Sequence, residues 1–237
     1  MKLKHCCSII FFTVCLVNAN AQNADKTSVG YLGNYENLPK IKFVQSNEAE
    51  YNQYKTVSEP ITLKIKENKF NFTLPTKAKK VKFKKTNQEQ NDFEGYDYLG
   101  YYPKLKMFAV TENSSSENLT FSSFGLVDSL TGHYYSVISI GDGAIEPPIP
   151  SLNSKYLVYY YNLAYKANSC FIGLLKVNID DKPVDHFKET MSFETDRLAV
   201  EDIKWIDDKN FIVKTYIKEM KNDSMVKIFS YFKSTIE

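Results

Sequence analysis

Short runs in which apolar and polar residues alternate are the feature that most restricts how this chain can fold. The alternation recurs in segments 61–66, 69–74 and 81–84. A period of two residues places successive side chains on opposite faces of a strand. No segment sustains the three- and four-residue apolar spacing of a capped amphipathic helix, and the best helical candidate is the short stretch 47–55. The chain is therefore predicted to be all-β.

Composition supports this prediction. The chain holds 17 Tyr and 16 Phe but only 1 Trp and 9 Gly, and aromatic residues favour half-buried pleated surfaces. Segments 61–66 and 69–74 predict a hairpin that turns at Glu67 and Asn68. In the next strand, inward-facing Val81 and Phe83 would place a stripe of lysines on the outer face. Such a stripe protects an exposed sheet edge or binds an acidic partner, and both readings stay open.

The first 21 residues have the pattern of a cleaved secretory signal peptide. A basic start is followed by 12 uncharged apolar residues, 6–17, and by a small-residue cleavage signature at Ala19 and Ala21. The apolar run is too short to span a bilayer, which needs about 20 residues. We therefore expect export to the periplasm or surface of a bacterial cell. The expected parts are the leader (1–21), a loosely ordered N-terminal arm (22–55) and a single all-β domain (56–237).

Removing the leader changes the numbers of charged residues and of cysteines. Of the 30 basic residues, Lys2 and Lys4 leave with it, so 28 basic residues balance the 28 acidic ones. A neutral chain has no global field to attract nucleic acid or acidic membranes, so neither nucleic-acid binding nor membrane insertion is expected. Cys170 is the only cysteine left outside the leader. It cannot form an intramolecular disulfide, and its apolar surroundings favour a buried small hydrophobe over a reactive thiol.

Strand-like bursts that begin near Met107, Tyr156 and Phe211 suggest an internal repeat of about 50 residues, the length of a four-stranded propeller blade. Segment 126–132 contains a D-x-x-T-G turn, and segment 150–157 follows it. Together they resemble the blade signature of WD40-like and other β-propeller proteins, in which S-P-D-G-K-x-L follows the turn. Here the proline precedes Ser151 instead of following it. Over residues 96–215 this resemblance implies antiparallel sheets in a propeller-like or partial-propeller arrangement. A twisted β-sandwich is the alternative.

Known catalytic and metal-binding motifs are missing from the sequence, so no cofactor or metal is expected. His133 is interpreted as a turn residue and His186 as half-exposed on an edge. Acidic pairs such as Asp207 and Asp208 are interpreted as solvated turns. The glycine-containing segment 141–146 is a better ligand candidate, because Asp142 and Glu146 could point to one spot.

The run Tyr159-Tyr160-Tyr161 is the most suggestive recognition feature. Alternation places Tyr160 opposite Tyr159 and Tyr161, so one face presents aromatic surface unless something covers it. Trp205 is interpreted as a packing residue. The favoured hypothesis is a non-catalytic exported module that binds a protein or glycan through loops and an aromatic face. An immunity-type inhibitor of a secreted toxin is one concrete form. A hydrolase using Asp142 and Glu146, or a structural envelope protein, is the alternative.

Overall fold

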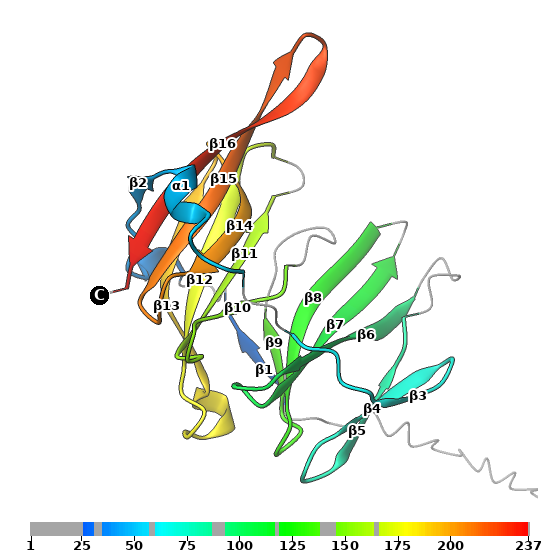
Figure 1. Cartoon of the computed structure of the whole chain (residues 1–237). Coiled ribbons are helices and arrows are strands. Elements are labelled where there is room, and N and C mark those ends of the chain that lie inside the picture. Colours follow the sequence, from blue (N-terminus) through cyan, green and yellow to red (C-terminus); the bar gives the residue numbers. More distant parts are fainter. Residues whose placement is uncertain are drawn as a thin grey trace, which may run out of the picture.

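The protein is an all-β molecule built from four sheets with very little helix (Figure 1). The computed structural model describes residues 26–30, 35–56, 60–86, 93–116, 119–137, 146–163 and 166–236. The predicted leader lies outside these residues. Antiparallel pairing dominates, and none of the described sheets closes into a barrel. The all-β prediction is therefore confirmed.

The largest sheet, called here the five-stranded sheet, has the order β1-β9-β8-β7-β6. Its strands are β1 (Lys26–Val29), β6 (Glu94–Tyr102), β7 (Met107–Ser116), β8 (Leu119–Asp128) and β9 (Tyr134–Val137). The pair β1–β9 is parallel and the other pairs are antiparallel. Asp128 closes the predicted turn after β8 by accepting hydrogen bonds from the Leu130 amide (2.8 Å) and the Thr131 hydroxyl (2.6 Å). Gly132 follows at a φ of 74°, which glycine adopts readily.

Two four-stranded sheets follow. The central sheet consists of β10 (Ile149–Pro150), β11 (Tyr156–Asn162), β12 (Cys170–Val177) and β13 (Phe187–Thr195). The C-terminal sheet has the order β14-β15-β16-β2, with β14 (Ala199–Trp205), β15 (Asn210–Lys221), β16 (Ser224–Thr235) and β2 (Val44–Ser46). Because β2 pairs with β16, a strand from the N-terminal segment completes the sheet formed by the last three strands.

The remaining strands form the small sheet, which has the order β3-β4-β5. They are β3 (Lys66–Glu67), β4 (Asn71–Pro75) and β5 (Lys80–Lys84). The only α-helix of the described chain, α1 (Glu48–Tyr51), lies within the predicted helical stretch and is capped by Asn47, whose side chain accepts the Glu50 amide. Short 3₁₀ turns are η1 (Tyr35–Asn37) and η2 (Pro183–Asp185).

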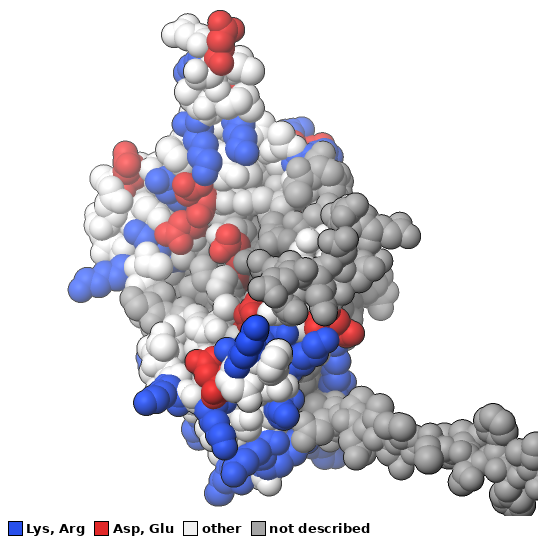
Figure 2. All heavy atoms as spheres, turned by 90° about the vertical axis from the view of Figure 1, so that its right-hand side faces the viewer, with Lys and Arg blue, Asp and Glu red and all other residues white. Residues whose placement is uncertain are grey.

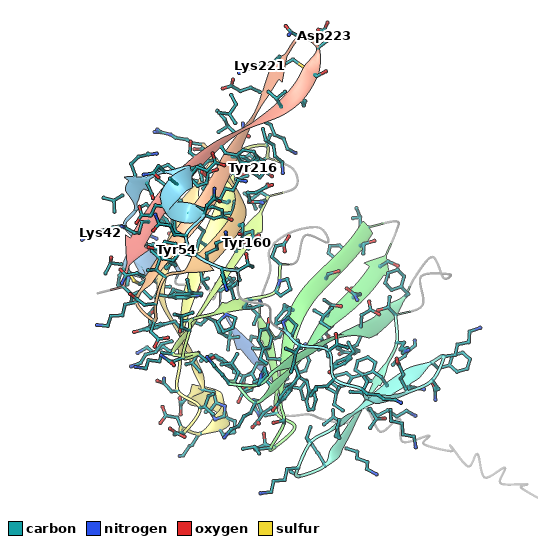
Figure 3. All side chains as sticks on the ribbon, viewed as in Figure 1. Lys42, Tyr54, Tyr160, Tyr216, Lys221 and Asp223 are labelled. Carbon is teal, nitrogen blue, oxygen red and sulfur yellow. The ribbon has the colours of Figure 1, made fainter. Side chains whose placement is uncertain are left out.

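The four sheets are stacked in a row through three apolar clusters. One cluster joins the small sheet to the five-stranded sheet, a second joins the five-stranded sheet to the central sheet, and a third joins the central sheet to the C-terminal sheet. The central sheet is consequently buried on both faces. Tyr159 and Tyr161 lie in the second cluster. Tyr160, which is labelled in Figure 3, lies in the third.

The strand bursts expected from the repeat occur in the structure. β7 begins at Met107, β11 at Tyr156 and β15 at Asn210, one residue before Phe211. Each is the second strand, in chain order, among the consecutive strands of its own sheet. Trp205 is buried as predicted, and its indole N–H donates to the Ile149 carbonyl (3.0 Å) across the third cluster.

The hairpin predicted for segments 61–66 and 69–74 is shifted in the structure. Only Lys66 and Glu67 form a strand on the first side, and Ile61 instead makes an isolated bridge with Tyr101 of β6. The turn runs from Asn68 to Asn71, because the Asn68 side chain accepts both the Phe70 amide (2.8 Å) and the Asn71 amide (2.9 Å). This local asparagine turn outcompetes the two-residue connection that alternation suggested.

The exposure expected for His186 is wrong, whereas His133 directly follows the turn as predicted and is also buried. His133 and His186 are 7% and 5% exposed. The His186 ring lies 2.6 Å from the Tyr135 hydroxyl through Nδ1 and 2.9 Å from the Asp181 carbonyl through Nε2. His133 Nε2 lies 2.8 Å from the Thr27 hydroxyl of β1. Both rings are buried because these partners satisfy their nitrogens, which sequence spacing alone could not reveal.

Candidate functional site: the lysine-lined hollow of the small sheet

The outer face of the small sheet carries the strongest charge pattern of the described chain. Strict alternation in β4 and β5 buries one face of each strand, and Phe72 and Phe83 stack there with ring centroids 5.2 Å apart. This inner face packs on the five-stranded sheet. The outer face is left to solvent, and the register places Lys66, Thr73 and Lys82 in one row across the three strands.

A hollow of about 480 Å³ lies on this outer face. Its lining residues are Lys64, Ile65, Lys66, Glu67, Asn68, Asn71, Thr73, Pro75, Lys80 and Lys82. Four of these ten residues are lysines and three carry amide or hydroxyl groups. The volume falls within the range of small-ligand pockets, about 300–1,000 Å³. Apolar atoms make up most of the lining surface, but its charged groups are four lysines against the single acid Glu67, so the charge of the hollow suits an anionic group.

The segment that forms the small sheet has a large excess of positive charge. Residues 60–86 contain nine lysines and a single acidic residue, Glu67. The Glu67 carboxylate is paired with the Lys85 ammonium at 2.6 Å. Within the described chain, no ion pair involves any of the five exposed lysines Lys64, Lys66, Lys80, Lys82 and Lys84. Figure 2 shows lysines gathered over the lower part of the molecule, where the small sheet lies.

The chemistry of this surface is attraction and hydrogen bonding. Lysine ammonium groups are flexible point charges with three donors each, and they attract carboxylate, sulfate or phosphate groups without a fixed bidentate geometry. Thr73 and Asn71 add neutral hydrogen-bonding groups at the centre of the face. The hollow is lined by neither histidine nor cysteine, and no group of three metal-ligating side chains occurs among the described residues.

The tyrosines expected to bind a ligand are built into the core. Tyr159 and Tyr161 are 3% and 2% exposed. The Tyr159 hydroxyl donates to the Glu189 carboxylate, and the Tyr161 ring stacks on Phe171 with centroids 5.1 Å apart. A Cβ atom on Gly173 would lie only 2.3 Å from the Tyr159 ring. The ring therefore packs directly against the backbone of β12 at Gly173, where there is no side chain. The aromatic face is therefore covered by the five-stranded sheet.

Of the two acidic candidates, the structure describes only Glu146. Asp142 lies outside the described residues. Glu146 is exposed at the start of the segment that leads into β10. Partial burial of its carboxyl raises the Glu146 pKa, and the nearby charge of Asp202 raises it further. These observations define no catalytic pair.

The polar cluster around Glu112 has a structural role. The Glu112 carboxylate on β7 accepts hydrogen bonds from the hydroxyls of Tyr96 and Tyr134, both at 3.1 Å, and pairs with the Lys26 ammonium at 3.0 Å. It thereby joins β1, β6, β7 and β9. Burial, followed by the Glu112 charge, raises the pKa of both tyrosines far above the ordinary value, so they stay neutral donors.

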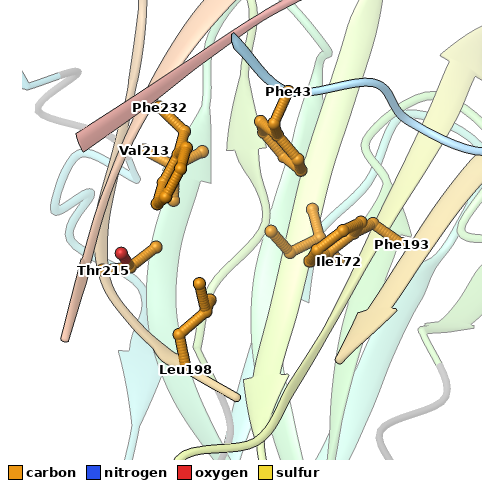
Figure 4. Close-up of a pocket in the computed structure, with 7 residues that line it drawn as sticks. All are labelled: Phe43, Ile172, Phe193, Leu198, Val213, Thr215 and Phe232. Atoms are coloured by element: carbon orange, nitrogen blue, oxygen red, sulfur yellow. The ribbon is translucent and has the colours of Figure 1, made fainter. Parts of the chain in front are cut away.

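A small apolar pocket of about 60 Å³ lies between the central and C-terminal sheets (Figure 4). Phe43, Phe193 and Phe232 border it together with Ile172, Leu198, Val213 and Thr215. Such a volume holds about two water molecules, which is too little for an organic ligand. We interpret it as a packing defect of the third cluster.

Sequence reasoning identified the lysine stripe but not the hollow. The stripe on β5 was visible because Lys80, Lys82 and Lys84 alternate with buried residues. Lys64 and Lys66 join it only through the pairing of β3 with β4. The excess of lysine over acid in residues 60–86 was the available signal, and the net charge of the whole chain, only +2, concealed it.

Comparison with known proteins adds no assignment. No protein-family model, no curated protein and no solved structure matches this chain. Among the described residues, no helix has the length and apolar character needed to cross a membrane.

Proposed function

We propose that this chain is a non-catalytic binding module that captures an anionic partner on the outer face of the small sheet. The observation that carries this proposal is the group of exposed lysines around the hollow, which no described acid neutralises. Unpaired like charges repel one another, so an anionic partner that enters the hollow relieves this repulsion while gaining its own attraction. Export of the protein and a role in recognition rather than catalysis are parts of the same proposal.

The propeller-like arrangement is also a proposal. It is supported by three sheets that each contain consecutive strands in simple antiparallel order. The repeated strand bursts, each in the same position within its sheet, support it further. In this arrangement the five-stranded, central and C-terminal sheets are blade-like units of an open array, with the small sheet packed at one end. A stacked array of this kind holds the outer face of the small sheet away from the apolar interfaces.

A charge-removal experiment tests the binding proposal. The purified protein is loaded on immobilised dextran sulfate, a polyanion, and eluted with a salt gradient. The variant Lys66→Gln/Lys82→Gln removes two charges from one row of the hollow and is expected to bind about 30-fold more weakly, at about 1 kcal/mol for each lysine near an anionic surface. The matched control Lys218→Gln/Lys221→Gln removes two exposed lysines from the distant β15–β16 hairpin (Figure 3).

The control variant is expected to elute close to the unmodified protein. Equal losses in both variants would show that retention depends only on total charge, which would contradict a site on the small sheet. Circular dichroism of each variant checks that the fold is intact. These lysines are exposed, so their substitution is expected to change the free energy of unfolding by less than about 0.5 kcal/mol.

A further inference from the structure

An exposed aromatic residue stands at the tip of the β3–β4 turn, beside the lysines. Phe70 is 66% exposed, the same fraction as Met220, and no described large hydrophobic residue is more exposed. The Asn68 side chain holds this turn through the amides of Phe70 and Asn71. The Phe70 side chain is therefore held out toward solvent by a defined local structure. Exposing it costs free energy that a partner could recover.

The charges around Phe70 distinguish this tip from the other exposed apolar positions. Lys69 lies with its ammonium 5.8 Å from the Phe70 ring centroid, and the Lys85 amide donates to the Phe70 carbonyl. Phe121, which is 46% exposed on β8, is in register with Ser114 of β7, and Ser114 is in register with Glu94 of β6. The row across these strands therefore contains an acid and no lysine. Phe229 of β16 also has a lysine beside its ring, with the Lys214 ammonium 4.0 Å from the centroid, but it is only 39% exposed. Among the described residues, the β3–β4 tip joins the more exposed aromatic ring to the lysines of the hollow.

The lysines near this tip differ in what they pair with. Alternation along β5 places Lys82 and Lys84 on the outer face, whereas Lys85 lies on the inner-face side and is paired with Glu67. The charges left for a partner are therefore those of the outer face and of exposed Lys69 at the tip. A planar anionic layer that the tip enters meets the Phe70 ring and these lysines at once. With a rise of about 3.3 Å per residue, Lys66 and Lys82 lie about 10 Å from the tip, which is close to the Debye length in physiological salt.

We propose that the small sheet docks on the surface of an anionic phospholipid bilayer, with the Phe70 ring entering the boundary between headgroups and acyl chains. This inference rests on the proposed anion-binding function and names the partner. The lysines supply a diffuse attraction to the lipid phosphates, and Phe70 supplies apolar contact. Only the tip enters the interface, and all the strands stay outside the bilayer. Although the mature chain is neutral overall, the charge of this one segment is sufficient for the attraction, because the field near a surface is local.

Vesicle co-sedimentation of the purified protein tests this inference. The vesicles contain phosphatidylcholine alone, or phosphatidylcholine and phosphatidylglycerol at a ratio of about 3 to 1, which gives the negative surface that the lysines require. Binding is expected only to the anionic vesicles. The variant Phe70→Ser is expected to weaken this binding about tenfold and to leave retention on dextran sulfate unchanged. Phe121→Ser, the matched control, is expected to change neither.

A spectroscopic readout follows the tip directly. The variant Phe70→Trp adds an exposed indole to a chain whose natural Trp205 is 2% exposed. Its emission is expected to shift to the blue when anionic vesicles are added and to stay unchanged with dextran sulfate. A blue shift with both ligands would indicate a protected site for anions in general and would overturn bilayer docking.

The outcomes separate this inference from the proposed function. Normal retention on dextran sulfate without binding to anionic vesicles would overturn the bilayer proposal alone. Equal vesicle binding by Phe70→Ser and the unmodified protein, together with full competition by free inorganic phosphate, would identify a soluble-anion site instead. Loss of neither retention nor vesicle binding in Lys66→Gln/Lys82→Gln would overturn both.

Discussion

Strands β11 and β5 show how differently two strands of one molecule can be buried. In β11 the residues Leu157, Val158 and Tyr159 are 0%, 0% and 3% exposed, so neighbouring residues are buried on opposite faces. In β5 exposed lysines alternate with buried Val81 and Phe83. β11 belongs to a sheet covered on both sides, whereas β5 belongs to a sheet covered on one side. A strand tolerates charge only where a face is left uncovered, and this molecule leaves one face of its small sheet uncovered.

This difference separates stability from recognition. The second and third clusters contain the large aromatic rings and bury almost no charged groups. The small sheet contributes its inner face to the core and carries its charges where their desolvation costs little. Substitutions are therefore expected to affect unfolding in the central sheet and binding on the outer face of the small sheet.

The largest change in the free energy of unfolding is expected when an aspartate is placed in β11 and, in separate variants, in β5. Leu157→Asp and Val158→Asp are each expected to lower the free energy of unfolding by more than about 4 kcal/mol, because either position buries an unpaired carboxylate. Of the neighbouring pair Val81 and Lys82 in β5, only Val81→Asp should behave in this way, and Lys82→Asp should change stability by less than about 0.5 kcal/mol. Urea unfolding followed by circular dichroism measures these differences. Tolerance of aspartate at either β11 position would show that the central sheet is open on one face.

The reactivity of a thiol provides a second contrast. Cys170 begins β12 and is fully buried, and burial, with a smaller effect of the Glu194 charge, raises the pKa of its thiol to about 12. At pH 8 its modification by a thiol reagent is expected to be about 10³-fold slower than that of an ordinary cysteine with a pKa near 8.5. A cysteine introduced by Thr73→Cys on the small sheet should react rapidly. Fast modification of Cys170 in the folded protein would contradict the burial of this strand.

A smaller change in stability is expected from removing the charge of Asp208, which lies where the central and C-terminal sheets meet. The Asp208 carboxylate, in the turn before β15, accepts hydrogen bonds from the Ser151 hydroxyl (2.9 Å) and from the Asn153 amide and side chain (both 2.7 Å). Partial burial acts to raise its pKa, but these hydrogen bonds and the Lys155 charge outweigh it, so the Asp208 pKa is lowered. The stabilisation is therefore complete above the unfolded pKa of about 4 and is lost as pH falls through the folded pKa.

The variant Asp208→Asn is accordingly expected to lose about 1 kcal/mol at pH 7 and to approach the unmodified protein at lower pH. Asp180→Asn, at an exposed turn position, is the control and should change the free energy of unfolding by less than about 0.5 kcal/mol. Urea unfolding at several pH values measures both. A constant difference in stability between Asp208→Asn and the unmodified protein at all pH values would show that the negative charge of Asp208 does not contribute to the stabilisation.

The smallest effect is expected at the single acid of the small sheet. Glu67→Gln breaks the ion pair with Lys85, and since the Glu67 side chain is 55% exposed, stability should change by less than about 0.5 kcal/mol. Retention on dextran sulfate should increase slightly, because the face becomes more positive. Reduced retention would mean that Glu67 organises the lysines instead of opposing them.

The sequence predicted those parts of the fold that depend on local alternation. β5, the turn after Asp128 and the starts of β7, β11 and β15 were all identified because each has a local pattern. The first strand of the small sheet was misplaced because a side-chain hydrogen bond at Asn68 sets the turn. The burial of Tyr159 and Tyr161 could not be predicted, since it depends on a distant sheet packed against the central one.

The site was predictable in part for the same reason. Alternation in β5 predicted a row of outward lysines, and the structure places them on the exposed face. The contribution of Lys66 depends on non-local pairing, and the exposure of Phe70 depends on the shifted turn. Total charge was a poor guide, because the excess acids of the chain lie outside residues 60–86.

The strand β2 has a consequence for the order in which the molecule folds. Its residue Val44 is in register with Lys233 of β16, so the two partners are far apart in the chain. Pairing between such distant segments is slow, because a long loop must close before any contact is gained. During synthesis β2 emerges early and stays without its partner until β16 has followed. The C-terminal sheet is thus completed only after β16 has been made.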